Sequence, residues 1–197
     1  MLGGAWYDSL VLDWQALAPE GPRPVRRVEF EQMAELGMFE DERVELLRGV
    51  LVRMTPPGPP HEATVQRLTR LLVMAVADRG WVRVASSWAA GEYSQPLPDV
   101  CVVPPGEYDR AHPTEAWLVV EVSQSSLRKD RSIKAALYAE CGVPEYWIVN
   151  LIDGVIEVHS DPDGGEYRQV RSCSRGNRIR LLRLPDVEVL ADDVLPA

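Results

Sequence analysis

Apolar residues recur at helical spacing in one long segment, and this pattern gives the clearest predicted helix. Between residues 61 and 79 they stand three or four positions apart, as one face of an α-helix requires. These residues are Ala63, Val65, Leu68, Leu71, Leu72, Ala75 and Val76. Shorter helices are predicted for residues 30–36 and near residues 131–140. A glycine follows each of the three segments or stands close behind it, which favours a helix end there.

Short runs of β-branched and aliphatic residues predict the strands of a sheet. They cover about residues 81–85, 100–103, 117–122 and 146–149. A strand, a helix and a strand follow one another from residue 117 to residue 149, and this order implies a parallel crossover. Turn signals inside residues 43–54 and 155–170 predict two hairpins. We therefore expect an α/β (α+β) protein with a mixed central sheet flanked by helices.

Length and composition favour one folded unit. With 197 residues, 46% of them hydrophobic, the chain is long enough for one sizeable core and too short for two ordinary ones. Residues 1–25 hold Trp and Pro without clear periodicity, so we expect an N-terminal arm there and a single domain over residues 26–197.

Location is predicted from what the sequence lacks. We expect no membrane association, because no apolar run approaches the roughly 20 residues of a membrane helix and no signal peptide is recognisable. A reducing, cytoplasmic location suits the widely spaced Cys101, Cys141 and Cys173.

Two acidic residues stand where buried strands should carry aliphatic side chains. Glu121 interrupts the run 117–122, and Asp99 directly precedes the run 100–103. A lone buried carboxylate is costly unless it is paired or coordinated. Because side chains alternate along a strand, Glu121 shares a face with Ser123. Two carboxylates suit Mg²⁺, so we predict that Asp99 and Glu121 bind a divalent cation. A turn-capping role for Asp99 and an ion pair with a buried arginine for Glu121 are the alternatives.

Two further side chains are candidates for the same site. Glu45 alternates with Val44 and Leu46, so its carboxylate could complete the coordination shell, orient a water molecule, or lie on an exposed face. His61 follows the proline-rich segment 55–60 and could contact a substrate phosphate or hold the end of the helix.

The lysines are informative because they are rare. The chain has 21 Lys and Arg residues together, and only Lys129 and Lys134 are lysines. An ammonium group is a compact charge that can neutralise charge developing on a phosphate. We predict Lys134 as the catalytic lysine, with a surface helix lysine as the alternative. For Lys129, phosphate contact or solvation is expected.

The net charge of −9 argues against a protein that coats nucleic acid through surplus basic residues. It does not exclude a metal-dependent nuclease, because a bound cation can reverse the local field. One basic cluster covers residues 128–134, and we expect a second to be solvated surface. The second cluster consists of Arg171, Arg175, Arg178, Arg180 and Arg183.

Several motifs form an ordered set between about residues 30 and 170. They are Glu45, Pro98-Asp99-Val100, Glu121-Val122-Ser123, Asp130 with Lys134, and Gly142-Val143-Pro144-Glu145-Tyr146-Trp147. Together they resemble the Uma-two family of restriction endonucleases, which belongs to the PD-(D/E)XK nuclease superfamily. The resemblance implies a restriction-endonuclease-like fold, Mg²⁺ as the metal with Mn²⁺ able to substitute, and DNA as the partner. A homodimer is expected by analogy with enzymes that cut both strands.

The resemblance also implies residue roles. Asp99 and Glu121 would be the metal-binding acids, Glu45 the acid from the preceding element, and Lys134 the catalytic lysine. The general superfamily motif places its lysine two residues after the second acid, where this chain has Ser123. The resemblance implies that Lys134 reaches the same point in space from the following helix.

The leading hypothesis is a metal-dependent endonuclease that hydrolyses phosphodiester bonds of DNA. Ser123 and the acidic net charge motivate an alternative, a catalytically inactive nuclease-fold module that binds a partner. A metal phosphoesterase acting on a small substrate is a third option.

Overall fold

A six-stranded mixed sheet forms the centre of the computed structural model, which describes residues 19–196. Its strands are β3 (Trp81–Val84), β4 (Val100–Val103), β5 (Leu118–Ser123), β6 (Glu145–Asn150), β7 (Val155–Asp163) and β8 (Glu166–Cys173), paired in this order. Only β5 and β6 run parallel, and every other neighbouring pair in this sheet is antiparallel. The predicted mixed sheet and its parallel crossover are therefore confirmed.

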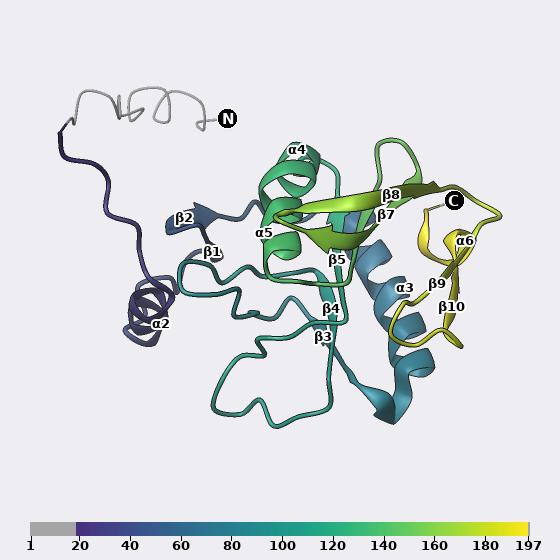
Figure 1. The fold of residues 1–197 in the computed structure, drawn as a ribbon, viewed down its shortest axis with the longest axis horizontal. Coiled ribbons are helices and arrows are strands. Elements are labelled where there is room, and N and C mark those ends of the chain that lie inside the picture. The colour runs from purple at the N-terminus through teal and green to yellow at the C-terminus, as the bar shows by residue number, and fades with distance from the viewer. Residues whose placement is uncertain (1–18, 197) are drawn as a thin grey trace.

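Helices lie on both faces of the sheet (Figure 1). One face is covered by α3 (Pro59–Val76), which a 3₁₀ turn (Ala77–Arg79) extends, and by the C-terminal elements. These are β9 (Arg178–Arg180), β10 (Glu188–Leu190) and α6 (Ala191–Val194). The connection from β5 to β6 covers the other face with α4 (Leu127–Lys129), a π-helical turn (Asp130–Lys134) and α5 (Ala135–Glu140). Beyond it lie α2 (Arg27–Glu35) and a hairpin of β1 (Val44–Leu47) and β2 (Val50–Arg53).

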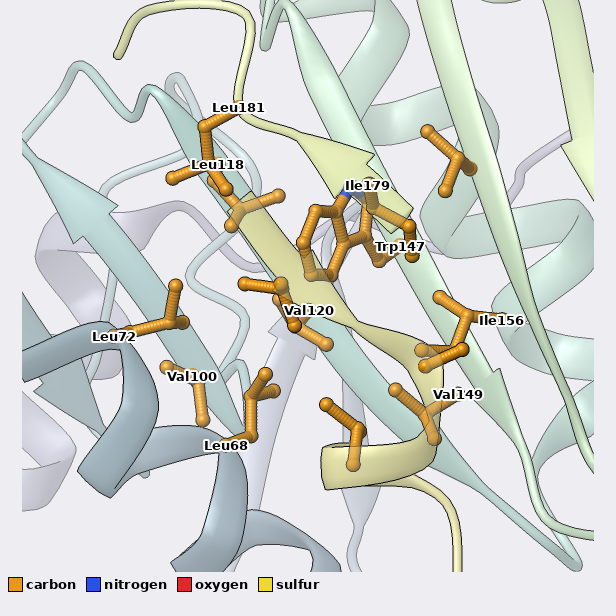
Figure 2. Close-up of a cluster of buried hydrophobic side chains, with 14 of the residues drawn as sticks. Leu68, Leu72, Val100, Leu118, Val120, Trp147, Val149, Ile156, Ile179 and Leu181 are labelled. Carbon is orange, nitrogen blue, oxygen red and sulfur yellow. The ribbon is translucent and has the colours of Figure 1, made fainter. Parts of the chain in front are cut away.

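The larger core lies between α3, the sheet and the C-terminal segment. Figure 2 shows Leu68 and Leu72 of α3 pointing toward the strand residues Val100 and Val120, with Trp147 between the sheet and the C-terminal segment. All five side chains are completely buried. Burial of side chains this large contributes about 1.5–3 kcal/mol each to folding. The amphipathic pattern of the longest predicted helix thus identified its core face correctly.

The opposite face of the sheet carries a smaller, more polar core. Tyr138 of α5 packs against Tyr146 of β6, with ring centroids 4.9 Å apart, and against Trp88, at 5.7 Å. The strand alternation places Glu121 on this face, beside Val119 and away from Val120. The predicted orientation of Glu121 is therefore correct, and its carboxylate is directed toward the crossover connection.

Several predicted boundaries differ from the observed ones. The long helix begins at Pro59 because two prolines occupy its first turn, where their missing N–H groups cost nothing. The crossover helix begins at Leu127, four residues earlier than predicted. The turn between β7 and β8 is only Gly164-Gly165, at φ +58° and +92°, so the predicted turn segment 161–165 was too long. The elements β9, β10 and α6 were not predicted.

Residues 1–18 lie outside the described part of the chain, so of the predicted arm only residues 19–25 are included. At its end, the Val25 N–H donates to Gly49 O at 2.9 Å in the turn between β1 and β2. Among residues 19–196, no helix has the length and apolar character needed to cross a bilayer.

Glu145 connects the start of β6 to the C-terminal segment. Its carboxylate accepts hydrogen bonds from the Trp147 indole N–H at 2.8 Å and from the Leu182 backbone N–H at 2.8 Å. Glu145 is buried, and burial raises the pKa of its carboxyl group above the ordinary value. The acid within the Gly142–Trp147 motif is therefore a structural acceptor that fastens the segment before β10 to the sheet.

We predict that Glu145→Ala lowers the free energy of unfolding by about 1–3 kcal/mol, because the buried Trp147 N–H and the backbone N–H of Leu182 lose their acceptor. Urea denaturation followed by tryptophan fluorescence measures the change. Glu166→Ala is the control, since Glu166 is exposed on β8, and it should stay within about 0.5 kcal/mol of wild type. A loss for Glu145→Ala no larger than that of the control would contradict the structural role.

Candidate active site

Asp99, Glu121 and Lys134 line one cleft at the end of β5. The cleft has a volume of about 400 Å³. One wall consists of the end of β2 and the proline-rich segment before α3, and the other consists of residues 121–126 and the π-helical turn. The structure therefore brings together three of the four predicted site residues at one surface, while Glu45 lies behind it.

Glu121 is held from the crossover connection. Its Oε1 accepts hydrogen bonds from Lys134 Nζ at 2.9 Å and from the Tyr138 hydroxyl at 2.6 Å. Only 4% of the residue is exposed, yet it lines the cleft. The alternative of a buried arginine as its partner is wrong, because the partner is a lysine.

The register of the strands places Asp99 beside Glu121. In the antiparallel pair of β4 and β5, Val100 lies opposite Val120. Asp99, one residue before β4, accepts a hydrogen bond at Oδ2 from the Val122 backbone N–H at 2.8 Å. The acid preceding one strand is thereby anchored next to the acid within the other. Asp99 therefore accepts a backbone N–H from a neighbouring strand and not from its own turn, as the capping alternative had supposed.

His61 contacts Asp99 from the first turn of α3. Its Nε2 lies 3.1 Å from Asp99 Oδ2, and this hydrogen bond holds the pKa of His61 above its ordinary value. His61 Nδ1 is buried without a hydrogen-bond partner among the described residues. His61 was predicted to contact a substrate phosphate or to hold the end of the helix. Its observed contact orients the carboxylate of Asp99, and both predicted roles stay predictions.

Glu45 binds two lysines. Its Oε2 lies 3.0 Å from Lys134 Nζ, and its Oε1 accepts a hydrogen bond from Lys129 Nζ at 2.7 Å. Glu45 has no exposed surface and does not line the cleft, so the exposed-face alternative is wrong. Lys129 is paired with Glu45 and 28% of its side chain is exposed, so it is partly solvated, and its contact with a phosphate stays a prediction. Glu45 therefore fixes the position of Lys134 from behind.

The π-helical turn explains why a lysine so far along the chain reaches Glu121. Asp130, the first residue of this turn, accepts hydrogen bonds at Oδ2 from the hydroxyls of Ser123 and Ser126, at 2.6 Å each. Ser123 occupies the place of the lysine in the general motif, and here it anchors the turn that carries Lys134. Single π-helical turns are frequent at functional sites.

Glu121 lies among several other carboxylates. Glu121 feels the carboxylates of Asp99, Asp130 and Glu45, and burial together with these charges raises its pKa to about 8 against the opposing effect of Lys134. Burial alone would lower the pKa of Lys134, but the adjacent Glu121 and Glu45 raise it above the ordinary value. Lys134 is therefore a permanent cation near neutral pH.

Some functional contacts were missed by the sequence analysis. Tyr138 stands four residues after Lys134, and this spacing puts both side chains on one face of a helix. That signal was available. Much of the basic character outside the cleft is neutralised by acids, as with Arg131 and Glu157 at 2.6 Å, or Arg180 and Glu188 at 2.5 Å. The five late arginines are all exposed, which confirms the expectation that they form solvated surface.

The donor set suits a cation that keeps part of its water. Within residues 19–196, no three or more His, Cys, Asp or Glu side chains are arranged as a complete ligand group. Mg²⁺ is usually held by one or two carboxylates plus water, so Asp99 and Glu121 satisfy its requirement. The carboxylates of Asp99 and Asp130 near Glu121 also favour a cation there.

Comparison with known proteins supports the fold and identifies the family. The fold has the arrangement of a nuclease whose crystal structure is described as "a putative nuclease belonging to DUF820 from Anabaena variabilis". The two chains share 13% identity with a TM-score of 0.68, over 87% of this chain and 97% of that one. The sequence profile of the Uma2 family, described as "Putative restriction endonuclease", matches residues 27–193. The chain belongs to this family, and its membership supports a nuclease function. No curated protein matches the sequence.

We predict that Lys134→Met lowers the free energy of unfolding by about 3–5 kcal/mol near neutral pH, because it leaves Glu121 and Glu45 buried without Lys134. The pKa of Glu121, already raised to about 8, rises further without the ammonium group. A group whose pKa is higher in the folded state stabilises the fold as pH falls. The deficit should therefore shrink as pH falls toward about 8, and below about pH 8 Glu121 should change it no further, because the wild-type carboxyl is then protonated as well.

Urea denaturation of both proteins at each pH measures this change. Arg128→Met is the matched control, because Arg128 is exposed on the neighbouring turn. It should remain close to wild type at every pH. A deficit for Lys134→Met that stays constant or grows as pH falls toward about 8 would disprove the proposed charge balance.

Proposed function

We propose that this protein is a metal-dependent endonuclease that hydrolyses phosphodiester bonds of DNA. The observation that carries the proposal is the meeting of Asp99, Glu121 and Lys134 at one cleft, from a strand start, a strand interior and a π-helical turn. Two acids and a lysine at one surface provide cation binding together with charge stabilisation, and phosphodiester hydrolysis needs both.

Asp99 and Glu121 would hold the Mg²⁺ or Mn²⁺ ion. When bound, such an ion polarises a phosphoryl oxygen and lowers the pKa of a water molecule. Asp99 is oriented for this role by the Val122 N–H and by His61, at 2.8 Å and 3.1 Å. Glu121 is oriented by Lys134 and Tyr138. Each acid therefore enters the cleft with its position fixed by the protein.

Lys134 acts through its charge. Because its pKa is raised by Glu121 and Glu45, it keeps its proton near neutral pH and cannot serve as a general base. A fixed ammonium group beside the acids stabilises the negative charge that develops on a phosphate under attack. Glu45 is a positioning residue, since its carboxylate contacts Lys134 and has no access to the cleft.

We expect phosphates to bind basic side chains that are not paired with carboxylates. Arg43 and Arg53 line the cleft, and neither side chain forms an ion pair with a described residue. Lys129 and Lys134, in contrast, are paired with Glu45. These two arginines are the groups that we expect to attract the DNA backbone to an otherwise acidic chain.

The alternative, an inactive nuclease-fold module, relied on Ser123 in place of the motif lysine. Lys134 Nζ lies 2.9 Å from Glu121, so a lysine is present beside the acid despite that replacement. This contact favours the enzyme over the binding module. A homodimer with two such clefts would suit cleavage of both strands of a duplex, and we propose it by analogy with the fold.

We predict that the wild type cuts a supercoiled plasmid with Mg²⁺ or Mn²⁺ and not with EDTA. Asp99→Asn and Glu121→Gln should each slow cleavage about 100-fold or more, since each removes a charge from the metal site. Asp78→Asn, in the exposed turn after α3, is the control and should cut normally. Circular dichroism verifies folding. Equal cleavage by folded wild type and both site variants, or none by folded wild type, would refute the proposal.

We further predict that Glu45→Gln lowers kcat about 10- to 100-fold and leaves KM nearly unchanged. The amide keeps the shape of the side chain and loses the charge that fixes Lys134. Steady-state cleavage of a labelled oligonucleotide separates the two constants. Glu42→Gln, an exposed neighbour, should change neither. If Glu45→Gln raised KM alone, Glu45 would contribute to substrate binding and the positioning role would be wrong.

A further inference from the structure

A second hollow adjoins the cleft along the outer side of α3. Its volume is about 690 Å³, and it shares Arg43, Pro57, His61 and Asp99 with the cleft. The two hollows are therefore continuous at the metal-binding acid. We call the second hollow the α3 groove.

The helical spacing of α3 builds one wall of this groove. Leu68 and Leu72 face the sheet (Figure 2), and the residues of the groove lie on the adjoining rows of the helix. One row is Val65, Thr69 and Val73, and the next is Glu62, Gln66, Arg70 and Met74. The end of β3 supplies the other wall, with Val84 and Ala85.

The exposed apolar side chains in the groove are unusual for a surface next to a charged site. Val73 is 51% exposed, Met74 is 72% exposed and Val84 is 38% exposed. Grouped apolar surface of this kind marks a binding site more often than scattered residues do. The volume lies within the range of roughly 300–1,000 Å³ for pockets that take drug-sized ligands.

We propose that the α3 groove receives the unpaired bases next to the scissile phosphate, so that the strand being cut is locally single-stranded there. The proposal rests on the nuclease function proposed above. The continuity at Asp99 means that an occupant of the groove lies next to the phosphate in the cleft. In a duplex the base faces are stacked inside the helix and cannot contact Val73 or Met74. A single strand presents those faces freely.

The polar residues of the groove match the rest of a nucleotide. Arg43 stands where the groove joins the cleft and Arg70 stands on α3, and neither forms an ion pair with a described residue. Both guanidinium groups are free to contact phosphates on either side of a base. Glu62 and Gln66 lie on the same wall and can bind the amino and carbonyl edges of bases.

The test measures binding with EDTA present, so that no cleavage occurs. Three labelled probes of one length are compared: a single strand, the matching abasic strand with the same phosphates, and the duplex. The wild type should bind the single strand more tightly than the abasic strand. We expect the difference in Kd to be about fivefold, because aliphatic side chains should bind a base no better than the weakest aromatic contacts do. Val73→Ser combined with Met74→Ser should remove this difference. Binding of the abasic strand should not change.

The matched control is Val170→Ser combined with Ile152→Ser. These two side chains are 59% and 62% exposed and lie outside the α3 groove. The control should keep the preference for bases. Arg70→Gln should weaken binding of both strands equally, because it removes a phosphate contact.

Three outcomes would overturn the proposal. Equal binding of the single and abasic strands by wild type, while plasmid cleavage persists, would refute the groove and leave the nuclease intact. Loss of both binding and cleavage would refute both. The remaining alternative is that a second copy of the chain occupies the groove, and light scattering tests it. If the wild type is a dimer and the double serine variant is a monomer, the groove is an interface between copies of the chain.

Discussion

The buried ion pairs of Lys134 connect three separate parts of the chain. The ammonium group contacts Glu45 of the first hairpin and Glu121 of the central sheet, and the lysine itself belongs to the turn between β5 and β6. Each carboxylate would be costly to bury without it. These ion pairs reduce the cost of burying the two carboxylates, and they also fix the position of the hairpin relative to the cleft. Stability and the arrangement of the site depend on one side chain.

The sequence predicted the elements that bring the two metal-site acids together. Asp99 and Glu121 were recognisable because each interrupts or borders an aliphatic strand, and because neighbouring strands bring such positions side by side. The orientation of Glu121 followed from alternation alone. These inferences succeeded because they depend on backbone periodicity, which is written locally in the chain.

The failures concern contacts that no local pattern encodes. Glu45 was expected at the metal or at the surface, yet it holds lysines 84 and 89 residues away, and no spacing rule predicts such a pairing. The π-helical turn at Asp130 depends on hydrogen bonds from Ser123 and Ser126, so it too is a tertiary feature. The missed strands β9 and β10 are three residues each, too short for a visible alternation, and tertiary contacts such as those of Glu145 hold them in place.

The hydrogen bond between Ser123 and Asp130 has a wider consequence. In the general motif the acid and the lysine share one strand, so a change in that strand affects both at once. Here they lie 13 residues apart, on a strand and on a turn that fold against each other. Sequence scans that look for the two groups at fixed short spacing would overlook this arrangement. The sequences of the strand and of the turn can therefore change separately, provided that Asp130 and the hydroxyl of Ser123 are retained together.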